Sequence, residues 1–120
     1  MDSPRGVTRL SKQEAAESLS KLIHERPAVK AVFTGLHYLS AALDGVVYPG
    51  PEGSAVVRPV KKMPGSFLRF DPSAATSVEF GNARGLSGKR FDDRLILSAL
   101  TFIYPDKTKL TLFELTPDWD

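Results

Sequence analysis

The segment from Ala83 to Arg90 has the combination of glycines and cations that most resembles a phosphate-binding site. In the P-loop, backbone amides hold the phosphates and a lysine reaches the terminal ones. Here alanine occupies position 83, where the first glycine of that motif belongs, and Arg90 replaces the metal-binding serine or threonine. The sequence therefore does not predict a nucleotide loop. A looser anion-binding loop of glycine amides with Arg84, Lys89 and Arg90 stays a hypothesis beside a solvated turn.

Two histidines and a pair of aspartates are the remaining groups that could take part in catalysis. His24 and His37 have no partner at the i, i+4 spacing of a helical zinc site. A base role for His37 would need a carboxylate brought to it by the fold. Asp92 and Asp93 are adjacent, so on an extended chain their carboxyl groups point to opposite sides. We predict no metal site and no cofactor, assign no catalytic residue, and leave an enzymatic role as the less favoured alternative.

Cations concentrate in the middle of the chain. Residues 58–90 contain seven cations and two anions, whereas residues 1–57 balance six against six and residues 91–120 sum to −3. Such a segment can attract phosphate groups or acidic partners. Phe67 and Phe70 are three residues apart and face opposite sides of a regular strand, so stacking on nucleic acid is a weaker alternative. The anion-binding candidates are Arg58, Lys61, Lys62, Arg69, Arg84, Lys89 and Arg90.

Composition indicates an ordinary globular protein. The 120 residues suit one domain, and 42% hydrophobic with 25% charged residues is not typical of a disordered chain. The absence of cysteine excludes disulfides and thiolate metal sites. No run approaches the roughly 18 apolar residues that span a bilayer. We expect a single soluble, cytoplasmic domain over residues 1–120, with residues 1–9 as a flexible N-terminal tail and no membrane partner.

A helix is predicted to begin after Ser11. Ser11 and Glu14 form a capping-box pattern, in which each side chain bonds the backbone amide of the other. Pro27 ends the helix because its ring disfavours helical geometry at Arg26. The apolar stripe comprises Ala15, Ala16, Leu19, Leu22 and Ile23, and the opposite, polar face carries Lys12, Glu14, Glu17, Ser18, Lys21 and Glu25.

Residues 28–43 fit two structures. Their apolar residues follow the helical period, and Asp44-Gly45 is a typical helix stop, which favours a second helix. The β-branched run from Val29 and the presence of Gly35 support a long strand, bent at that glycine, with a single helix lying across the sheet.

The rest of the chain is predicted to be β-structure. Residues 54–60 are expected to form an edge strand because Pro59 cannot donate to a ladder. Residues 66–70 and 76–80 are predicted to pair as a hairpin with Val78 and Phe80 facing inward. The irregular stretch 81–93 is the first candidate for a functional loop.

The strongest signal is a final hairpin of residues 94–104 and 109–115 around a type I turn at Pro105-Asp106. Its first strand has apolar residues on both faces, with Leu95, Leu97, Ala99 and Ile103 on one and Ile96, Leu100, Phe102 and Tyr104 on the other. Such a strand is expected to be buried on both sides, by the N-terminal helices on one face and by another sheet layer, a curled barrel wall or a second subunit on the other.

The predicted fold is α+β, with one or two N-terminal helices packed on a curved antiparallel sheet of four to six strands built from successive hairpins. The favoured function is a small, non-enzymatic binding or interaction domain that forms a homodimer through its sheet. The alternative is a small-ligand pocket between helix and sheet, or a small enzyme with such a pocket. Its predicted lining residues are His37, Tyr38, Tyr48 and Arg94. Anion or nucleic-acid binding through residues 58–90 is the third hypothesis.

Overall fold

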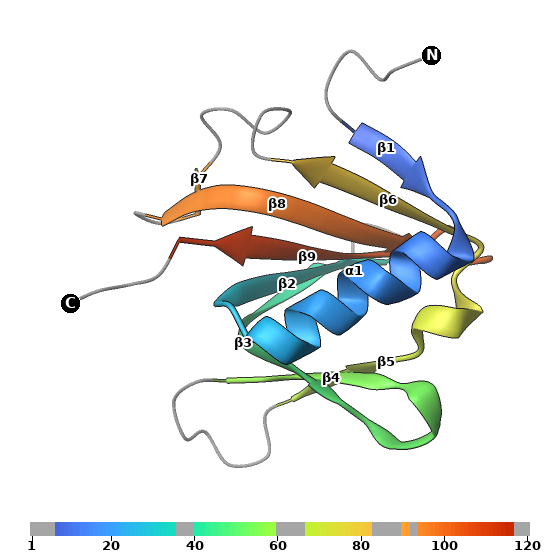
Figure 1. Ribbon diagram of the computed structural model, residues 1–120, viewed down its shortest axis with the longest axis horizontal. Coiled ribbons are helices and arrows are strands. Elements are labelled where there is room, and N and C mark those ends of the chain that lie inside the picture. The colour runs from blue at the N-terminus through green and yellow to red at the C-terminus, as the bar shows by residue number, and fades with distance from the viewer. Residues whose placement is uncertain (1–6, 36–39, 60–66, 83–89, 92–93, 117–120) are drawn as a thin grey trace.

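The computed structural model describes residues 7–35, 40–59, 67–82, 90–91 and 94–116. One α-helix and nine strands occur in these ranges (Figure 1). In chain order they are β1 (Val7–Leu10), α1 (Lys12–Glu25), β2 (Val29–Thr34), β3 (Ser40–Pro49), β4 (Ala55–Arg58), β5 (Leu68–Phe70), β6 (Ser77–Asn82), β7 (Arg90–Phe91), β8 (Arg94–Ile103) and β9 (Lys109–Leu115). Thus Val7, Thr8 and Arg9, within the segment expected to be a tail, belong to a strand.

The capping box at the start of α1 is confirmed. Ser11 Oγ accepts from the Glu14 amide at 3.1 Å, and the Ser11 amide donates to Glu14 Oε1 at 3.0 Å. At the other end Arg26 adopts the left-handed conformation, and its amide donates to the Leu22 carbonyl before Pro27 continues the chain. The helix buries Ala15, Leu19 and Leu22 against the sheet.

Eight strands hydrogen-bond in the order β1-β6-β8-β9-β2-β3-β4-β5, all pairs antiparallel, and β7 pairs with β8. The α+β class is confirmed, but the expected four to six strands were too few. The helix lies across one face of this sheet (Figure 1). We call that face the inner face and the opposite one the outer face.

The described parts of residues 28–43, which are 28–35 and 40–43, contain no helix, so the favoured helix prediction was wrong. Val29–Thr34 and Ser40–Pro49 pair as neighbouring strands β2 and β3. Along β2, Val29 and Ala31 are buried on the inner face while Lys30 and Val32 are less buried. Both the helical and the strand pattern fit these apolar residues. Strand β2 pairs with β3 on one side and with β9 on the other, and these two partners satisfy its backbone N–H and C=O groups.

Two predictions about strand order were also wrong. Strand β4 is not an edge, because it pairs with β3 and β5, and Pro59 follows its last residue. Strands β5 and β6 do not form a hairpin, because β6 lies between β1 and β8 at the other end of the sheet. The inward direction of Val78 and Phe80 is confirmed, since Val78 is buried and Phe80 packs against the same core.

The final hairpin is confirmed, with a correction to its faces. The Lys107 amide donates to the Tyr104 carbonyl at 2.8 Å and closes the predicted turn. Leu100 and Phe102 of β8 are buried on the inner face. A β-bulge between Ile96 and Ser98 shifts the register, so that Ile96 pairs with Leu115 and joins the outer-face cluster of Ala99 and Leu115.

The expected burial of both faces of β8 holds only in part. Ile96 and Ala99 are buried on the outer face. Leu95 and Leu97 remain 45% and 38% exposed. The bulge therefore breaks the simple alternation on which that expectation depended.

Candidate functional site

The structure describes only some of the residues that the sequence predicted to line a pocket. Tyr48 lies near the end of β3 and is half-buried. His37 and Tyr38 fall outside the described residues. Arg94 begins β8, and its side chain is outside the described part as well.

The predicted anion-binding residues also lie partly inside and partly outside the described ranges. Arg58 ends β4 and Arg69 is the middle residue of β5, and both are exposed. Arg90 lies in β7, with its side chain outside the described part. Outside the described residues lie Lys61, Lys62, Arg84 and Lys89, together with most of the candidate loop at 81–93.

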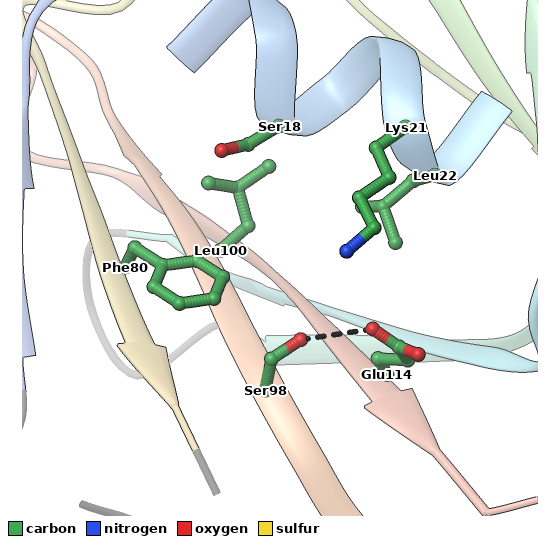
Figure 2. Close-up of a pocket in the computed structure, with 7 residues that line it drawn as sticks. All are labelled: Ser18, Lys21, Leu22, Phe80, Ser98, Leu100 and Glu114. Atoms are coloured by element: carbon green, nitrogen blue, oxygen red, sulfur yellow. Dashed lines mark hydrogen bonds between the residues drawn. The ribbon is translucent and has the colours of Figure 1, made fainter. Parts of the chain in front are cut away.

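A hollow of about 280 Å³ opens between α1 and the inner face of β6, β8 and β9 (Figure 2). We call it the helix–sheet hollow. Leu22, Phe80 and Leu100 form its apolar walls. Its volume lies just below the roughly 300–1,000 Å³ typical of small-molecule sites. Its lining consists of Ser18, Lys21, Leu22, Phe80, Ser98, Leu100 and Glu114.

The sheet contributes a fixed carboxylate to this hollow. Ser98 and Glu114 are register partners on β8 and β9, and Ser98 Oγ donates to Glu114 Oε1 at 3.2 Å. This bond uses one carboxylate oxygen and restrains the side chain. The pair therefore presents an oriented acceptor to whatever occupies the hollow.

The helix contributes an ammonium group and a hydroxyl. Ser18, Lys21 and Leu22 have the i, i+3, i+4 spacing that places side chains on one side of a helix. Figure 2 shows the Lys21 chain extending from α1 toward the strand that carries Glu114. No hydrogen bond or ion pair involves Lys21 within the described chain. Positive and negative groups thus line one hollow without direct pairing.

The β-bulge in β8 keeps a large side chain out of this region. In a regular strand Ile96 would share the face of Ser98 and Leu100, next to the hollow. The bulge instead turns Ile96 to the outer face, where it packs with Leu115. Bulges often redirect a side chain beside a functional site, and this one has that effect here.

Sequence reasoning missed this site. The helical pattern assigned Ser18 and Lys21 to the polar face of the helix, although they lie at its boundary with the sheet. Glu114 belongs to an alternating strand and resembles a solvent-facing residue. Ser98, a hydroxyl within the apolar run of β8, was the one local signal that could have indicated a polar inner position.

A second group of polar residues gathers around Tyr48. The Arg26 guanidinium carbon lies 5.1 Å from the Tyr48 ring centroid, and that of Arg58 lies 6.0 Å from it. Both distances suit cation–π contacts. Tyr48 and Arg58, which were predicted for different sites, therefore belong together, and Arg26 was not predicted for either.

An apolar hollow of about 310 Å³ lies elsewhere, between β2, β3 and the start of β5. Phe33, Leu43 and Leu68 are among its lining residues, and Phe67 at its rim is 60% exposed. No charged side chain among the described residues lines it. It lacks the oriented polar groups that give the helix–sheet hollow its chemical character.

Three wider findings bear on the site. Within the described ranges no three histidine, cysteine or carboxylate side chains gather as metal ligands would. No helix within the described residues is long and apolar enough to cross a membrane. No protein-family model, curated protein or solved structure that was compared with the chain matches it.

Proposed function

We propose that the protein binds a small organic amine in the helix–sheet hollow. The observation that carries the proposal is the oriented carboxylate of Glu114, held by Ser98 in a hollow whose apolar walls are Leu22, Phe80 and Leu100. Convergent polar groups in an apolar hollow are typical of small-molecule sites. The sequence predicts a small-ligand pocket as an alternative function, and the present proposal keeps that function but gives the pocket different lining residues.

The chemistry of the lining defines the ligand. A protonated amine would donate to Glu114, forming a charge-assisted hydrogen bond stronger than a neutral one. Its hydrocarbon part would lie against Leu22, Phe80 and Leu100. Lys21 has only donors, so it favours a ligand whose far end carries an acceptor.

The test compares three ligands with closely related skeletons: phenethylamine, 2-phenylethanol and 3-phenylpropionate. Each is titrated into the ¹⁵N-labelled protein while amide shifts are followed by NMR. We expect phenethylamine to bind at least about tenfold more tightly than the alcohol, since its ammonium gains a charged acceptor. The shifts should centre on Ser98, Leu100 and Glu114.

Two variants separate this site from general charge attraction. Glu114→Gln should abolish the preference for the amine, because the amide is neutral. Glu79→Gln is the matched control, since Glu79 lies on β6 and pairs with Arg9 and Thr101, outer-face residues of the same sheet. Equal binding of amine and alcohol, or shifts that avoid β8 and β9, would overturn the proposal.

A second candidate function is self-association through the outer face. No described helix covers the outer face of β8, β9 and β2, where Val32, Thr101, Ile103 and Thr111 lie. These side chains are only partly buried. The outer face also carries positive and negative side chains, such as Lys30 and Asp44, which form an ion pair at 3.2 Å. Two copies related by a two-fold axis could therefore place opposite charges against each other.

Sedimentation equilibrium over a range of concentrations tests this dimer. Ile103→Glu should weaken the association at least about tenfold, because it replaces a partly buried apolar side chain of this face with a charge. Ser20→Glu, on an exposed position of α1, should leave it unchanged. A wild-type protein that stays monomeric at several hundred micromolar would exclude the dimer.

A further inference from the structure

Arg26, Tyr48 and Arg58 bring two guanidinium groups to one aromatic ring. Arg26 follows the last residue of α1, Tyr48 precedes the end of β3, and Arg58 ends β4. Their distances to the ring place the two guanidinium carbons at most about 11 Å apart. We call the three residues the arginine–tyrosine cluster.

The fold fixes the position of each member. Tyr48 pairs with Val56 and Arg58 pairs with Val46, so Tyr48 and Arg58 are diagonal neighbours on one face of the β3–β4 ladder. Their sequence neighbours Val47 and Val57 are fully buried in the core on the other face. Arg26 joins them because its left-handed conformation ends α1 and redirects the chain.

Within the described part of the chain, no acidic side chain pairs directly with the two arginines of the cluster. Neither Arg26 nor Arg58 has a carboxylate within 4.0 Å in the ranges the structure describes. Both arginines are exposed, whereas Tyr48 is half-buried. Their guanidinium N–H groups are therefore available to an anion.

Neighbouring charges limit the site to these two arginines. Arg69 shares the outer face of β5, but it lines a hollow together with Glu52 and Asp71, whose carboxylates offset its charge. Glu25 adjoins Arg26 in sequence, and Asp44 of β3 pairs with Lys30. The carbonyl end of α1 adds partial negative charge near Arg26.

We propose that the arginine–tyrosine cluster binds the phosphate group of a small phosphorylated molecule. A guanidinium presents a rigid fork of donors that matches phosphate oxygens, and a second guanidinium against the same ring adds to the positive charge that attracts the phosphate. Contact with the Tyr48 ring restrains both arginines, which reduces the entropy lost on binding. This site is separate from the helix–sheet hollow and does not depend on the amine ligand proposed there.

The test uses adenosine 5′-monophosphate, O-phosphoserine and inorganic phosphate, with adenosine as the ligand without phosphate. NMR titrations follow the side-chain Nε–H signals of Arg26 and Arg58. We expect saturable shifts for the phosphate esters at concentrations up to about 10 mM and none for adenosine, because the phosphate supplies the binding energy. Affinity should fall as salt rises from about 50 to 200 mM, because the charges are exposed.

Variants then test the specific geometry. Arg26→Gln and Arg58→Gln should each weaken adenosine monophosphate binding at least about fivefold, and Arg26→Lys should give an intermediate loss because it keeps the charge without the fork. Arg9→Gln removes the same charge from β1, at the opposite end of the sheet from β4 and β5, and should change the affinity less than about twofold.

Three results would overturn the inference. One is no saturable binding of any phosphate ester at concentrations up to about 10 mM. Another is a loss in Arg9→Gln equal to that in Arg58→Gln, which would indicate attraction to net charge alone. The third is equal binding of adenosine and its monophosphate, which would indicate recognition of the base.

Discussion

The substitution Ser18→Leu gives the sharpest test of the helix–sheet hollow. Ser18 lines the hollow from α1 and is half-buried, so a leucine there would extend into the cavity toward Phe80 and Leu100. Leucine replaces the hydroxyl with three apolar carbons beyond Cβ. Each buried CH₂ stabilises by about 0.8 kcal/mol, so half-burial of these carbons gives about 1 kcal/mol.

This gain is measurable. At about 2.1 cal/mol/K per residue, a chain of this length loses close to 0.25 kcal/mol of stability per degree, so the melting temperature should rise by about 4 °C. Differential scanning calorimetry measures the shift. The same substitution should weaken phenethylamine binding at least about tenfold by occupying the cavity, as NMR titration would show.

A matched control is available on the same helix. Ser20 is exposed, so Ser20→Leu makes the same change in helix propensity, a few tenths of a kcal/mol, without entering the hollow. The difference between the two variants isolates the cavity. If Ser18→Leu is no more stable than Ser20→Leu, or if it binds the amine as the wild type does, the hollow is not the binding site.

Further predictions concern the backbone and two titrating groups. Gly45→Ala should lower the free energy of unfolding, measured by urea denaturation, by about 2–3 kcal/mol. The new Cβ would clash with the Arg58 carbonyl oxygen and lie 2.6 Å from the carbonyl carbon. The Ser11 amide and hydroxyl lower the pKa of Glu14 below its usual 4.5. Its stabilising contribution should therefore be complete above pH 4.5 and be lost as pH falls through the lowered native pKa, which acid titration by NMR and circular dichroism would show. Burial, and secondarily the charge of Asp71, raises the pKa of Tyr104 from 10 to about 12, so its contribution should be complete below pH 10 and be lost as pH rises through about 12, as phenolate absorbance would show.

Each of these predictions has its own control. Gly53 has φ +80° and open space where an alanine methyl group would lie, so Gly53→Ala should cost only about 1 kcal/mol, from backbone strain. Glu14→Gln should remove the acid-dependent component, and an unchanged pH profile would contradict the capping-box contribution. Tyr104→Phe should remove the phenolate signal near pH 12; if the signal that this substitution removes lies near pH 10 instead, the ring is not buried as described.

Local sequence signals predicted those elements whose stability is decided within a few residues. The capping box at Ser11 and Glu14 and the proline after Arg26 fixed both ends of α1, because cap hydrogen bonds join neighbours in the chain. The turn at Pro105 and Asp106 likewise predicted where the two strands of the final hairpin meet. Asp106 also accepts from the Thr108 amide at 3.1 Å. Local capping and turn chemistry are readable without knowledge of the partners.

Elements with distant partners were predicted less well. Residues 29–34 fit a helix by period, but their ladder partners lie on other strands, Leu43 on β3 and Leu112 on β9. The pairing of β6 with β1 and β8 joins residues that no local pattern links. Apolar periodicity reports which residues are buried, but it does not report which strand they bury against.

The candidate sites depend on such distant pairings throughout. The sequence by itself determined an α+β chain with one capped helix, a strong final hairpin and a basic middle segment. Only the tertiary structure brought Glu114 beside Ser98 and under Lys21, and Arg26 beside Tyr48 and Arg58. The physical reason is that a cap or turn is stabilised by neighbours in the chain, whereas a site needs side chains from separate elements, whose meeting is set by strand order, register and one β-bulge.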